Sequence, residues 1–352
     1  MNRRHLLRAV WILRRTRWNF ALVRYVGNKL HSLLLRLFRS ESVAYPSNVM
    51  LELCNRCNLH CTTCAREYAF GREMDQGNMP VERAKNIVEQ LYPYLDSIGL
   101  TGMGETFLYP HLLEIARFVK EKKPSLVVSL STNAQVPRFV EQAEALLPYV
   151  DVIQVSTDGT GAVYELVRRG ARFARLEENL RALLPKAKAQ GVDVMLNMVL
   201  TKETVPEMAT LVEFAQNAGV PYLNFTYFNL VAATELDVSY YDLFRSPEFL
   251  RAKAEAEAAI RRCPGVEVTG LDFPGKPGFR KCPFPWSHFY ITWDGYLVPC
   301  CGKPFPKVLN FGNVADGKVI DLLNSFNYRF FRRMNRKNQT PPFCEKCHFI
   351  EL

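Results

Sequence analysis

The sequence predicts an α/β fold in which a parallel sheet of six strands is covered by helices. Short apolar runs rich in β-branched residues alternate with longer stretches of helical periodicity between residues 49 and 228. A strand, a helix and a second strand in succession form a right-handed unit with parallel strands. Polar residues follow several of the runs, at the strand ends where α/β barrels carry their chemistry. We therefore expect a barrel-like arrangement with the functional site at the carboxyl ends of the strands.

The first 40 residues differ from the rest of the chain in charge. The protein has 352 residues and a net charge of +10, from 45 Lys or Arg and 35 Asp or Glu. Ten of the basic residues and none of the acidic ones lie in residues 1–40, so the remaining chain is neutral. Leu30, Leu33, Leu34 and Leu37 repeat with the period of a helix. This composition is typical of a helix on an anionic membrane surface, and the alternative is a helical pair packed on the body with its arginines in water.

This basic arm has neither of the usual features of an exported or membrane-spanning segment. Basic residues interrupt its apolar runs too often for a spanning helix, and no apolar stretch precedes a small-residue cleavage site. We therefore expect a cytoplasmic protein whose residues 1–40 contact the inner face of the membrane. The neutral body predicts no nucleic-acid partner, because phosphate binding needs basic residues across a face.

Proline and glycine residues set the limits of the elements in the barrel. The expected strands are residues 49–53, 97–102, 126–133, 151–159, 192–201 and 222–228. The expected helices are residues 80–95, 110–124, 137–149, 173–191 and 205–219. Pro80 begins the first helix and Pro124 ends the second, while Gly191 and Gly219 close the last two.

The chain beyond residue 235 predicts a second, smaller unit. We expect a helix at 246–263 that leaves the barrel, a Gly- and Pro-rich linker at 264–279, and a hairpin at 289–301 around Asp294-Gly295. Another helix follows at 320–335. The chain is thus divided into a basic helical arm, a barrel, a helix with its linker and a C-terminal module, at residues 1–44, 45–235, 236–279 and 280–352.

Ten cysteines are the strongest functional signal. Nine lie in two groups, and a long chain without signs of export favours metal or cluster binding over disulfides. Cys57, Cys61 and Cys64 form a C-x3-C-x2-C loop directly after an expected strand. Zinc sites normally take four ligands in two pairs, whereas three thiolates occupy three corners of an iron–sulfur cube and leave one iron open. We expect Cys54 and Cys263 to be structural, because free cysteine packs as a small hydrophobic residue.

Residues 48–230 resemble the radical S-adenosylmethionine (SAM) superfamily, whose signature is C-x3-C-x2-C after the first strand. The resemblance implies a partial (βα)6 barrel of the TIM type. It also implies a [4Fe–4S] cluster whose open iron binds the amine and carboxylate of SAM. One electron, from a donor such as flavodoxin or ferredoxin, then cleaves SAM to methionine and a 5′-deoxyadenosyl radical.

Several further motifs carry the same resemblance. They are "GMGET" (102–106), "STN" (131–133), "STDG" (156–159) and "VRRGARF" (167–173). By this resemblance Glu105 receives the methionine amine, and Arg168 or Arg169 contacts the carboxylate. The residues that it assigns to SAM binding are Gly102, Gly104, Glu105, Ser131, Asn133, Ser156, Asp158, Arg168 and Asn197. Thr63 departs from the family, which often has an aromatic residue there, and Met103 and Thr106 replace the commoner Gly and Pro.

The second cysteine group resembles the SPASM/Twitch module of radical SAM enzymes, over residues 280–352. The resemblance implies a second, auxiliary [4Fe–4S] cluster with four protein ligands, namely Cys282, Cys300, Cys344 and Cys347. Cys301 is an alternative ligand to Cys300. If it is not a ligand, it is either structural or a hydrogen-atom donor. The alternative for the whole group is a zinc site of four cysteines.

Together the two resemblances predict a radical SAM enzyme that abstracts hydrogen from an unidentified substrate. An auxiliary cluster suits reactions in which a substrate radical loses an electron, so we expect an oxidative outcome, either dehydrogenation or coupling. One alternative is an epimerase, with Cys301 as hydrogen donor, or another enzyme that modifies a peptide, lipid or sugar. The other alternative is a non-catalytic zinc or iron–sulfur protein with a basic interaction arm.

Overall fold

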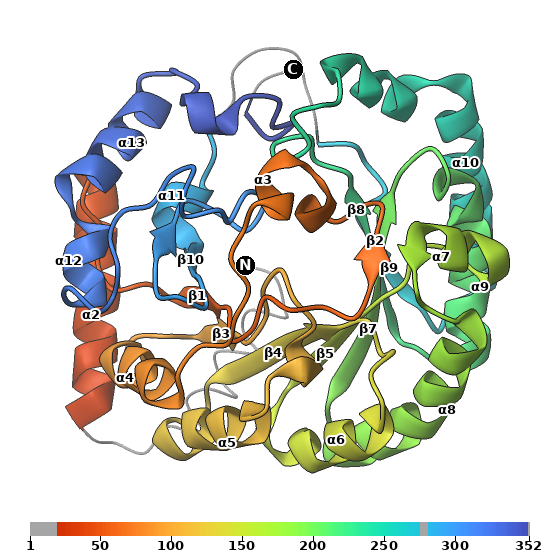
Figure 1. Cartoon of the computed structure of the whole chain (residues 1–352), viewed down its shortest axis with the longest axis horizontal. Helices are drawn as coiled ribbons and strands as arrows, with labels where there is room; N and C mark the ends of the chain where they lie inside the picture. The colour runs from red at the N-terminus through yellow and green to blue at the C-terminus, as the bar shows by residue number, and fades with distance from the viewer. Residues whose placement is uncertain (1–19, 275–280, 351–352) are drawn as a thin grey trace.

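A computed structural model describes residues 20–274 and 281–350 of the chain. Its main feature is one sheet in the order β11-β10-β1-β3-β4-β5-β7-β8-β9 (Figure 1). The six central strands are β1 (Asn48–Leu51), β3 (Ser97–Gly99), β4 (Val127–Thr132), β5 (Val152–Ser156), β7 (Asp193–Leu200) and β8 (Tyr222–Tyr227). Each pairs in parallel with its neighbour in this series. The predicted α/β fold with a mostly parallel sheet is therefore confirmed.

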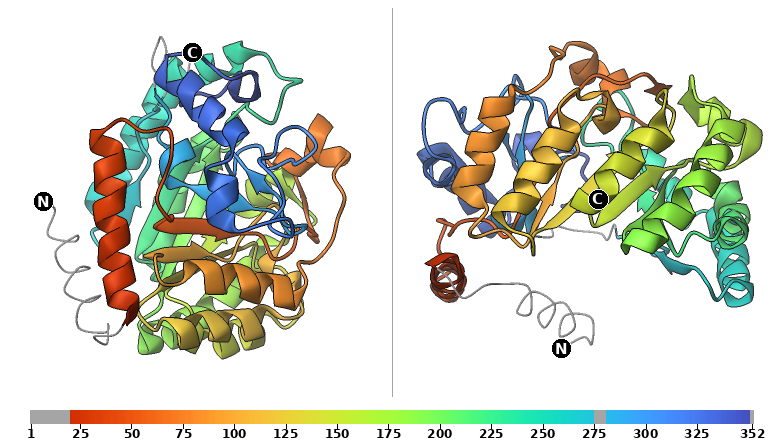
Figure 2. Two further views of the ribbon diagram at one scale, coloured as in Figure 1. Left: turned by 90° about the vertical axis from the view of Figure 1, so that its left-hand side faces the viewer. Right: turned by 90° about the horizontal axis from the view of Figure 1, so that it is seen from below.

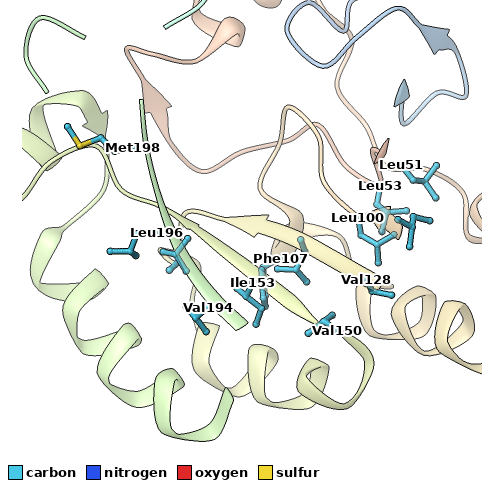
Figure 3. Close-up of a cluster of buried hydrophobic side chains, with 14 of the residues drawn as sticks. Leu51, Leu53, Leu100, Phe107, Val128, Val150, Ile153, Val194, Leu196 and Met198 are labelled. Atoms are coloured by element: carbon cyan, nitrogen blue, oxygen red, sulfur yellow. The ribbon is translucent and has the colours of Figure 1, made fainter. Parts of the chain in front are cut away.

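Helices cover the outer face of the sheet (Figures 1 and 2). They are α4 (Val81–Leu91), α5 (Leu112–Lys122), α6 (Phe139–Leu146), α7 (Gly161–Val167), α8 (Phe173–Gln190), α9 (Met208–Ala218) and α10 (Pro247–Arg262). In β4, Val128 and Leu130 are fully buried, whereas Ser129 and Ser131 are half-buried. The buried residues belong to the core between sheet and helices, part of which Figure 3 shows. The alternate residues therefore face the inner, concave side of the partial barrel.

The helix α10 was expected to leave the barrel, and this prediction is wrong. It packs against α9, and the chain then returns to form β9 (Glu267–Thr269), which pairs in parallel with β8. The stretch around β9 was expected to be only a linker. Pro264, Gly265 and Gly270 lie on either side of the three-residue strand, and because such residues are typical of loops, the sequence did not indicate a strand there. Val266, just before the strand, is 5% exposed and anchors it to the core.

The predicted C-terminal hairpin is confirmed, and its first strand extends the main sheet. β10 (Phe289–Ile291) and β11 (Leu297–Val298) are antiparallel to each other, while β10 pairs in parallel with β1. The helix expected at 320–335 is instead two helices, α12 (Val319–Leu323) and α13 (Phe326–Arg336). Ser325 between them caps α13 by accepting a hydrogen bond from the Tyr328 amide.

In the basic arm, the structure describes one helix, α2 (Phe20–Leu37), which lies on the outside of the molecule beside α12 and α13 (Figures 1 and 2). The rest of the predicted helical pair, residues 1–19, lies outside the described residues. None of the helices in the described part of the chain has an apolar stretch long enough to cross a bilayer.

Candidate active site

The loop that carries Cys57, Cys61 and Cys64 follows β1 at the carboxyl edge of the sheet and leads into α3 (Ala69–Arg72). A small antiparallel sheet fixes its middle: β2 (His60–Cys61) pairs with β6 (Arg168–Arg169), with Cys61 opposite Arg168. The Thr62 amide also donates to the Val167 carbonyl oxygen at 2.9 Å. Sequence patterns could not reveal β2 and β6, because two residues are too short for any periodicity. Their pairing brings the "VRRGARF" segment to the cysteines.

The three thiols lie near enough to act on one another electrostatically; Cys61 is buried, and Cys57 and Cys64 are half-buried. The pKa of Cys61 is raised to about 12, and burial is the largest cause. Arg168 lowers this pKa, while Cys64 and Cys57 also raise it. Burial likewise raises the pKa of Cys57 and of Cys64. Thiols that perturb one another in this way converge on one site, and a bound metal would supply the positive charge that makes them thiolates.

Two buried arginines beside these thiols have hydrogen-bond donors without an acceptor. Nη1 of Arg66 and Nε of Arg168 are buried and have no partner among the described residues. Both guanidinium groups lower the pKa of Cys57 and of Cys64, so both lie close to the thiols. A buried, unpaired cationic donor is costly unless an anionic group occupies the space beside it. The site therefore fits a negatively charged cluster with the SAM carboxylate, and Arg66 is a residue that sequence reasoning missed.

The "GMGET" loop is fixed to the end of β4 by Glu105, which is 2% exposed. One carboxylate oxygen accepts from the Thr132 hydroxyl at 2.7 Å and from the Phe107 amide at 3.1 Å, and the other accepts from the Asn133 amide at 2.7 Å. Glu105 thus has a structural role in addition to the predicted one. Its contact with the methionine amine stays a prediction.

Gly102 and Gly104 lie against the protein itself. A Cβ atom on Gly104 would lie 2.4 Å from the Arg56 carbonyl oxygen, and one on Gly102 would lie 2.3 Å from Cγ of Glu52. Glycines in the corresponding motif, by the resemblance, let the backbone approach SAM, and for Gly102 and Gly104 that contact stays a prediction. The close approach that the structure shows is between the "GMGET" loop, the cysteine loop and the end of β1.

The remaining predicted SAM contacts divide into two groups. Asn133 donates to Oδ1 of Asn58 at 3.0 Å and lies 3.8 Å from Sγ of Cys57, so it reaches the cysteine loop. Ser131 and Ser156 are half-buried near the carboxyl ends of β4 and β5. Asn133, Ser131 and Ser156 therefore lie at the same edge of the sheet as the cysteine loop. Their contacts with SAM stay predictions.

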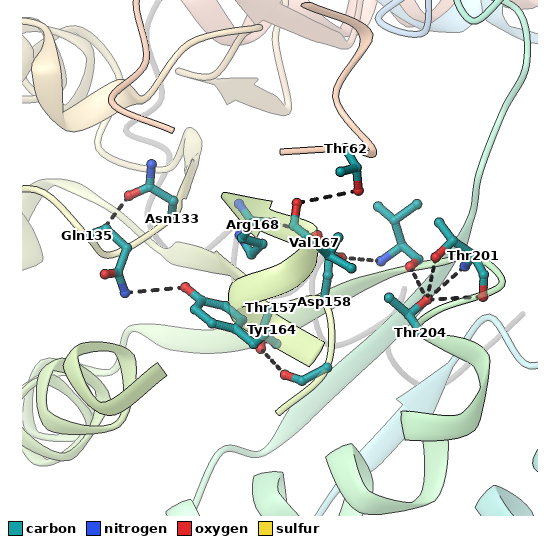
Figure 4. A network of polar contacts seen from close by, with 12 residues as sticks. Thr62, Asn133, Gln135, Thr157, Asp158, Tyr164, Val167, Arg168, Thr201 and Thr204 are labelled. Atoms are coloured by element: carbon teal, nitrogen blue, oxygen red, sulfur yellow. Dashed lines mark hydrogen bonds and ion pairs between the residues drawn. The ribbon is translucent and has the colours of Figure 1, made fainter. Parts of the chain in front are cut away.

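Asp158, Arg168 and Asn197 already have partners within the protein. Asp158 and Arg168 form a buried ion pair at 2.7 Å, and the second Asp158 oxygen accepts from the Val199 amide at 2.7 Å (Figure 4). The Asn197 side-chain oxygen accepts from Asn224 at 2.8 Å and from Thr226 at 2.9 Å. Arg169, the alternative to Arg168, is exposed.

The substitution Glu105→Gln is expected to weaken SAM binding about tenfold, because the methionine ammonium would lose an ionised acceptor and one backbone N–H, of Phe107 or Asn133, would face the amide NH2 group in place of an acceptor. The measurement is the SAM dissociation constant of the reconstituted protein by equilibrium dialysis. Thr132→Val is the matched control, since it removes one hydrogen bond to Glu105 and leaves the carboxylate. Equal SAM affinity of Glu105→Gln and the wild type would refute the role in amine binding.

The second cysteine group also converges. Cys282 precedes α11 (Phe284–Ser287), Cys300 follows β11, and Cys344 and Cys347 lie near the C-terminal end. The pKa of Cys344 is raised mainly by burial. The neighbouring thiols of Cys300, Cys347 and Cys282 raise it as well. Cys301 is exposed, but it raises the pKa of Cys282 and of Cys300, so it also lies beside this group, and the choice of Cys300 over Cys301 stays a prediction. Asn229, beyond β8, donates to Sγ of Cys347 at 3.4 Å and so connects this group to the barrel.

Within the described residues, no three Cys, His, Asp or Glu side chains come as close together as the ligands of one metal ion. A [4Fe–4S] cluster binds each thiolate at a different iron, so its ligands are more widely spaced.

Lys303 connects the second cysteine group to α3, the helix that follows the first cysteine loop, and was not foreseen from the sequence. It is 6% exposed, and its ammonium lies 4.8 Å from the ring centre of Phe70 in α3 and 5.1 Å from that of Phe343. Burial lowers its pKa, while Cys344, Glu345 and Cys300 raise it. A buried cation near these thiols, held by two aromatic faces, favours negative charge in the second site.

Comparisons with known proteins agree with this geometry. Residues 51–215 match the radical SAM superfamily, and residues 282–348 match SPASM, an iron–sulfur cluster-binding domain. A tungsten-containing aldehyde ferredoxin oxidoreductase cofactor-modifying protein of Pyrococcus furiosus is 24% identical, over 84% of this chain and 86% of its own. The PqqA peptide cyclase of Ruegeria pomeroyi is 23% identical, over 88% and 82%.

Solved structures show the same fold. SuiB of Streptococcus suis, bound to its precursor peptide SuiA, superposes with a TM-score of 0.67 at 17% identity, over 91% of this chain and 73% of its own. The enzyme anSMEcpe with bound AdoMet superposes with a TM-score of 0.62 at 18% identity, over 87% and 89%. The two domain matches give the cofactors, namely SAM with a [4Fe–4S] cluster for the barrel and an auxiliary [4Fe–4S] cluster for the SPASM domain. The chain therefore belongs to the radical SAM superfamily and carries a C-terminal SPASM domain.

Proposed function

We propose that this enzyme oxidises a peptide segment bound on the concave face of its partial barrel. The cofactors, when bound, supply one acceptor for a hydrogen atom and one for an electron. A substrate C–H group thus loses a hydrogen atom and then an electron and a proton, which gives a dehydrogenated or cross-linked product. The chain itself has to bind and orient the peptide and to exclude water from the reacting carbon.

The proposed ligands follow from the two groups of converging thiols. We assign Cys57, Cys61 and Cys64 to the cluster that binds SAM. We assign the auxiliary cluster to Cys282, Cys300, Cys344 and Cys347. The external electron for SAM cleavage comes, in this proposal, from a flavodoxin or a ferredoxin.

A polar ladder on the concave face is the observation that carries the choice of substrate. Across β7, β8 and β9, Asn197 accepts from Asn224 at 2.8 Å, and Asn224 accepts from Thr269 at 2.7 Å. Thr226 is exposed although β8 is an inner strand whose other face is covered by helices, so its side chain faces the barrel interior. The inward-facing side chains of the neighbouring strands continue this surface with Ser129, Ser131, Gln154 and Ser156.

These side chains are neutral amides and hydroxyls, which both donate and accept hydrogen bonds. Two half-buried apolar side chains of β7, Met195 and Val199, lie on the same face. This mixed surface matches the alternating N–H and C=O groups and the side chains of an extended peptide better than it matches a charged substrate. The names of two relatives support the same class, since one is a PqqA peptide cyclase and the SuiB structure contains a precursor peptide.

The test is an anaerobic incubation with SAM, a reductant and a library of synthetic peptides in D2O, read by mass spectrometry. We expect a product that has lost two hydrogen atoms, with one 5′-deoxyadenosine formed per product. The double variant Gln154→Ala/Thr269→Val, which changes none of the residues assigned to SAM and neither donor of Asn197, should raise the peptide KM at least tenfold and leave uncoupled SAM cleavage unchanged. A product of unchanged composition that carries one solvent deuterium would instead establish an epimerase, and loss of this product in Cys301→Ala would identify Cys301 as the hydrogen donor. SAM cleavage without any peptide product would refute the peptide assignment.

A further inference from the structure

The helix α2 exposes its apolar side chains and packs on the body through polar ones. Leu37 is 68% and Phe38 is 81% exposed, and five other apolar residues of this helix are also exposed, namely Val23, Val26, Leu30, Leu33 and Leu34. We call Val23, Val26, Leu30, Leu33 and Leu37 the outer stripe. Because a surface helix normally turns its apolar stripe to the core, this orientation is reversed.

Polar contacts hold α2 in this orientation. Asn28, which is 8% exposed, donates to the Tyr45 carbonyl oxygen and accepts from the Tyr45 amide, both at 2.9 Å. The Tyr25 hydroxyl and the Lys29 ammonium donate to the two oxygens of Asp96 at 2.6 and 2.7 Å. Leu37 follows Asn28 by about two and a half turns, so it lies on the opposite side of the helix. The outer stripe therefore points directly away from the protein.

Basic side chains flank the outer stripe. Arg36 is exposed on α2 about a quarter of a turn from the outer stripe, and Arg39 is exposed directly after the helix. Arg24 is exposed too, but it lies on the side of α2 that faces Tyr45, whose pKa it lowers. Residues 1–40 contain no acidic residue. Glu41, the first acid along the chain, is bound to Arg333 and Arg336 of α13. The exposed surface of α2 is therefore apolar along its centre, with positive charge along one edge and at its C-terminal end.

We propose that α2 docks on an anionic lipid bilayer, with the outer stripe inserted among the headgroups and the flanking arginines on lipid phosphates. An apolar face with basic residues at its sides is the composition that binds such a surface. The spacing of the stripe also resembles a coiled-coil seam. However, α2 has only 18 residues, and two copies side by side would bring positive flanks together without an acidic partner.

The position of α2 also orients the enzyme. Its contacts Tyr45 and Asp96 lie just before β1 and β3, at the amino-terminal edge of the parallel strands. The cysteine loop follows β1 at the opposite edge, and Figure 2 shows α2 and α3 on opposite sides of the sheet. Docking through α2 therefore leaves the entrance to the active site open to the aqueous phase.

The test is co-sedimentation of the full-length protein with vesicles of phosphatidylcholine, alone or mixed with phosphatidylserine. We expect binding only to the mixed vesicles, weakened by salt, and an at least tenfold loss of affinity in Leu30→Ser/Leu37→Ser. The matched control is Leu166→Ser/Leu250→Ser, which makes the same change at two sites that are 58% and 57% exposed elsewhere. SAM cleavage and thermal unfolding should be unchanged in both variants.

A second probe reports the depth of α2 directly. A Leu34→Trp variant should show a blue-shifted emission with mixed vesicles and no shift with phosphatidylcholine alone. The proposal is overturned if Leu30→Ser/Leu37→Ser binds mixed vesicles as tightly as the wild type. It is equally overturned if the wild type is a lipid-independent dimer that the same double substitution makes monomeric, because the outer stripe is then a subunit interface.

Discussion

A variant with Cys57→Ala, Cys61→Ala and Cys64→Ala is expected to lose all 5′-deoxyadenosine formation and about half of its reconstituted iron. The three side chains are the converging thiols of the loop after β1, and in the proposed assignment no other residues bind that cluster. The second cysteine group is separate in the chain and should still reconstitute about four of about eight irons. The measurements are iron and sulfide content and a chromatographic assay for 5′-deoxyadenosine.

The matched control replaces two cysteines that are assigned to neither cluster. Cys54 and Cys263 are buried, and Sγ of Cys54 accepts a hydrogen bond from the Arg56 amide at 3.3 Å. Cys54→Ala/Cys263→Ala should therefore keep the full iron content and activity. If this control loses iron as the triple variant does, or if the triple variant still cleaves SAM, the ligand assignment is wrong. Bound zinc in place of iron in the wild type would refute the enzyme altogether.

The substitution Glu52→Ala is expected to give the largest loss of stability among single changes near the site. Glu52 follows β1 and is 2% exposed. One oxygen accepts from the Met103 amide at 2.8 Å and the Tyr290 hydroxyl at 2.7 Å, and the other accepts from the Trp293 amide at 3.1 Å. Removing the carboxylate leaves three donors without an acceptor and a cavity, so we expect a loss of about 4 kcal/mol, measured by urea unfolding.

Glu52 also predicts a pH dependence, which Glu52→Gln isolates because it keeps the size of the side chain. Burial raises the pKa of Glu52 from 4.5 to about 7. The folded protein holds this proton more tightly than the unfolded chain. Its contribution to stability is therefore complete below pH 4.5 and is lost as the pH rises to about 7.

The stability of the wild type relative to Glu52→Gln should thus fall, by on the order of 3 kcal/mol, between these pH values. An unchanged difference from pH 5 to pH 8 would mean that Glu52 is ionised throughout.

The SAM dissociation constant should rise in Glu52→Ala, because Met103 lies within the "GMGET" loop.

The sequence predicted the central sheet because its signals are local. Each βα unit combines a buried apolar run with an amphipathic helix, and Gly191 and Gly219 close α8 and α9 with positive φ as expected. The three short pairings, β2 with β6, β9 with β8, and β10 with β1, escaped prediction, since they depend on partners far along the chain. Propensity cannot specify a strand of two or three residues, because tertiary contacts decide it.

The functional site, like the sheet, has one part that the sequence predicted and one part that it did not. The cysteines could be found from their spacing, since ligand geometry imposes short, fixed intervals. Arg66, Lys303 and Glu52 carry no such pattern. Their roles follow from burial, which turns an ordinary charged residue into one that must have a partner. The order of the residues alone does not show whether a charged side chain will be buried in the folded protein or exposed to water.

The pairing of β10 with β1 has a consequence for electron tunnelling. The strand β1 leads into the first cysteine loop and, through its hydrogen bonds to β10, supports the hairpin that leads to Cys300. Tunnelling rates fall steeply with separation, so two redox centres joined by a hinge would exchange electrons only in some orientations. Here one continuous ladder of backbone hydrogen bonds sets the separation. The rate of electron exchange should therefore be independent of solvent viscosity and of substrate binding.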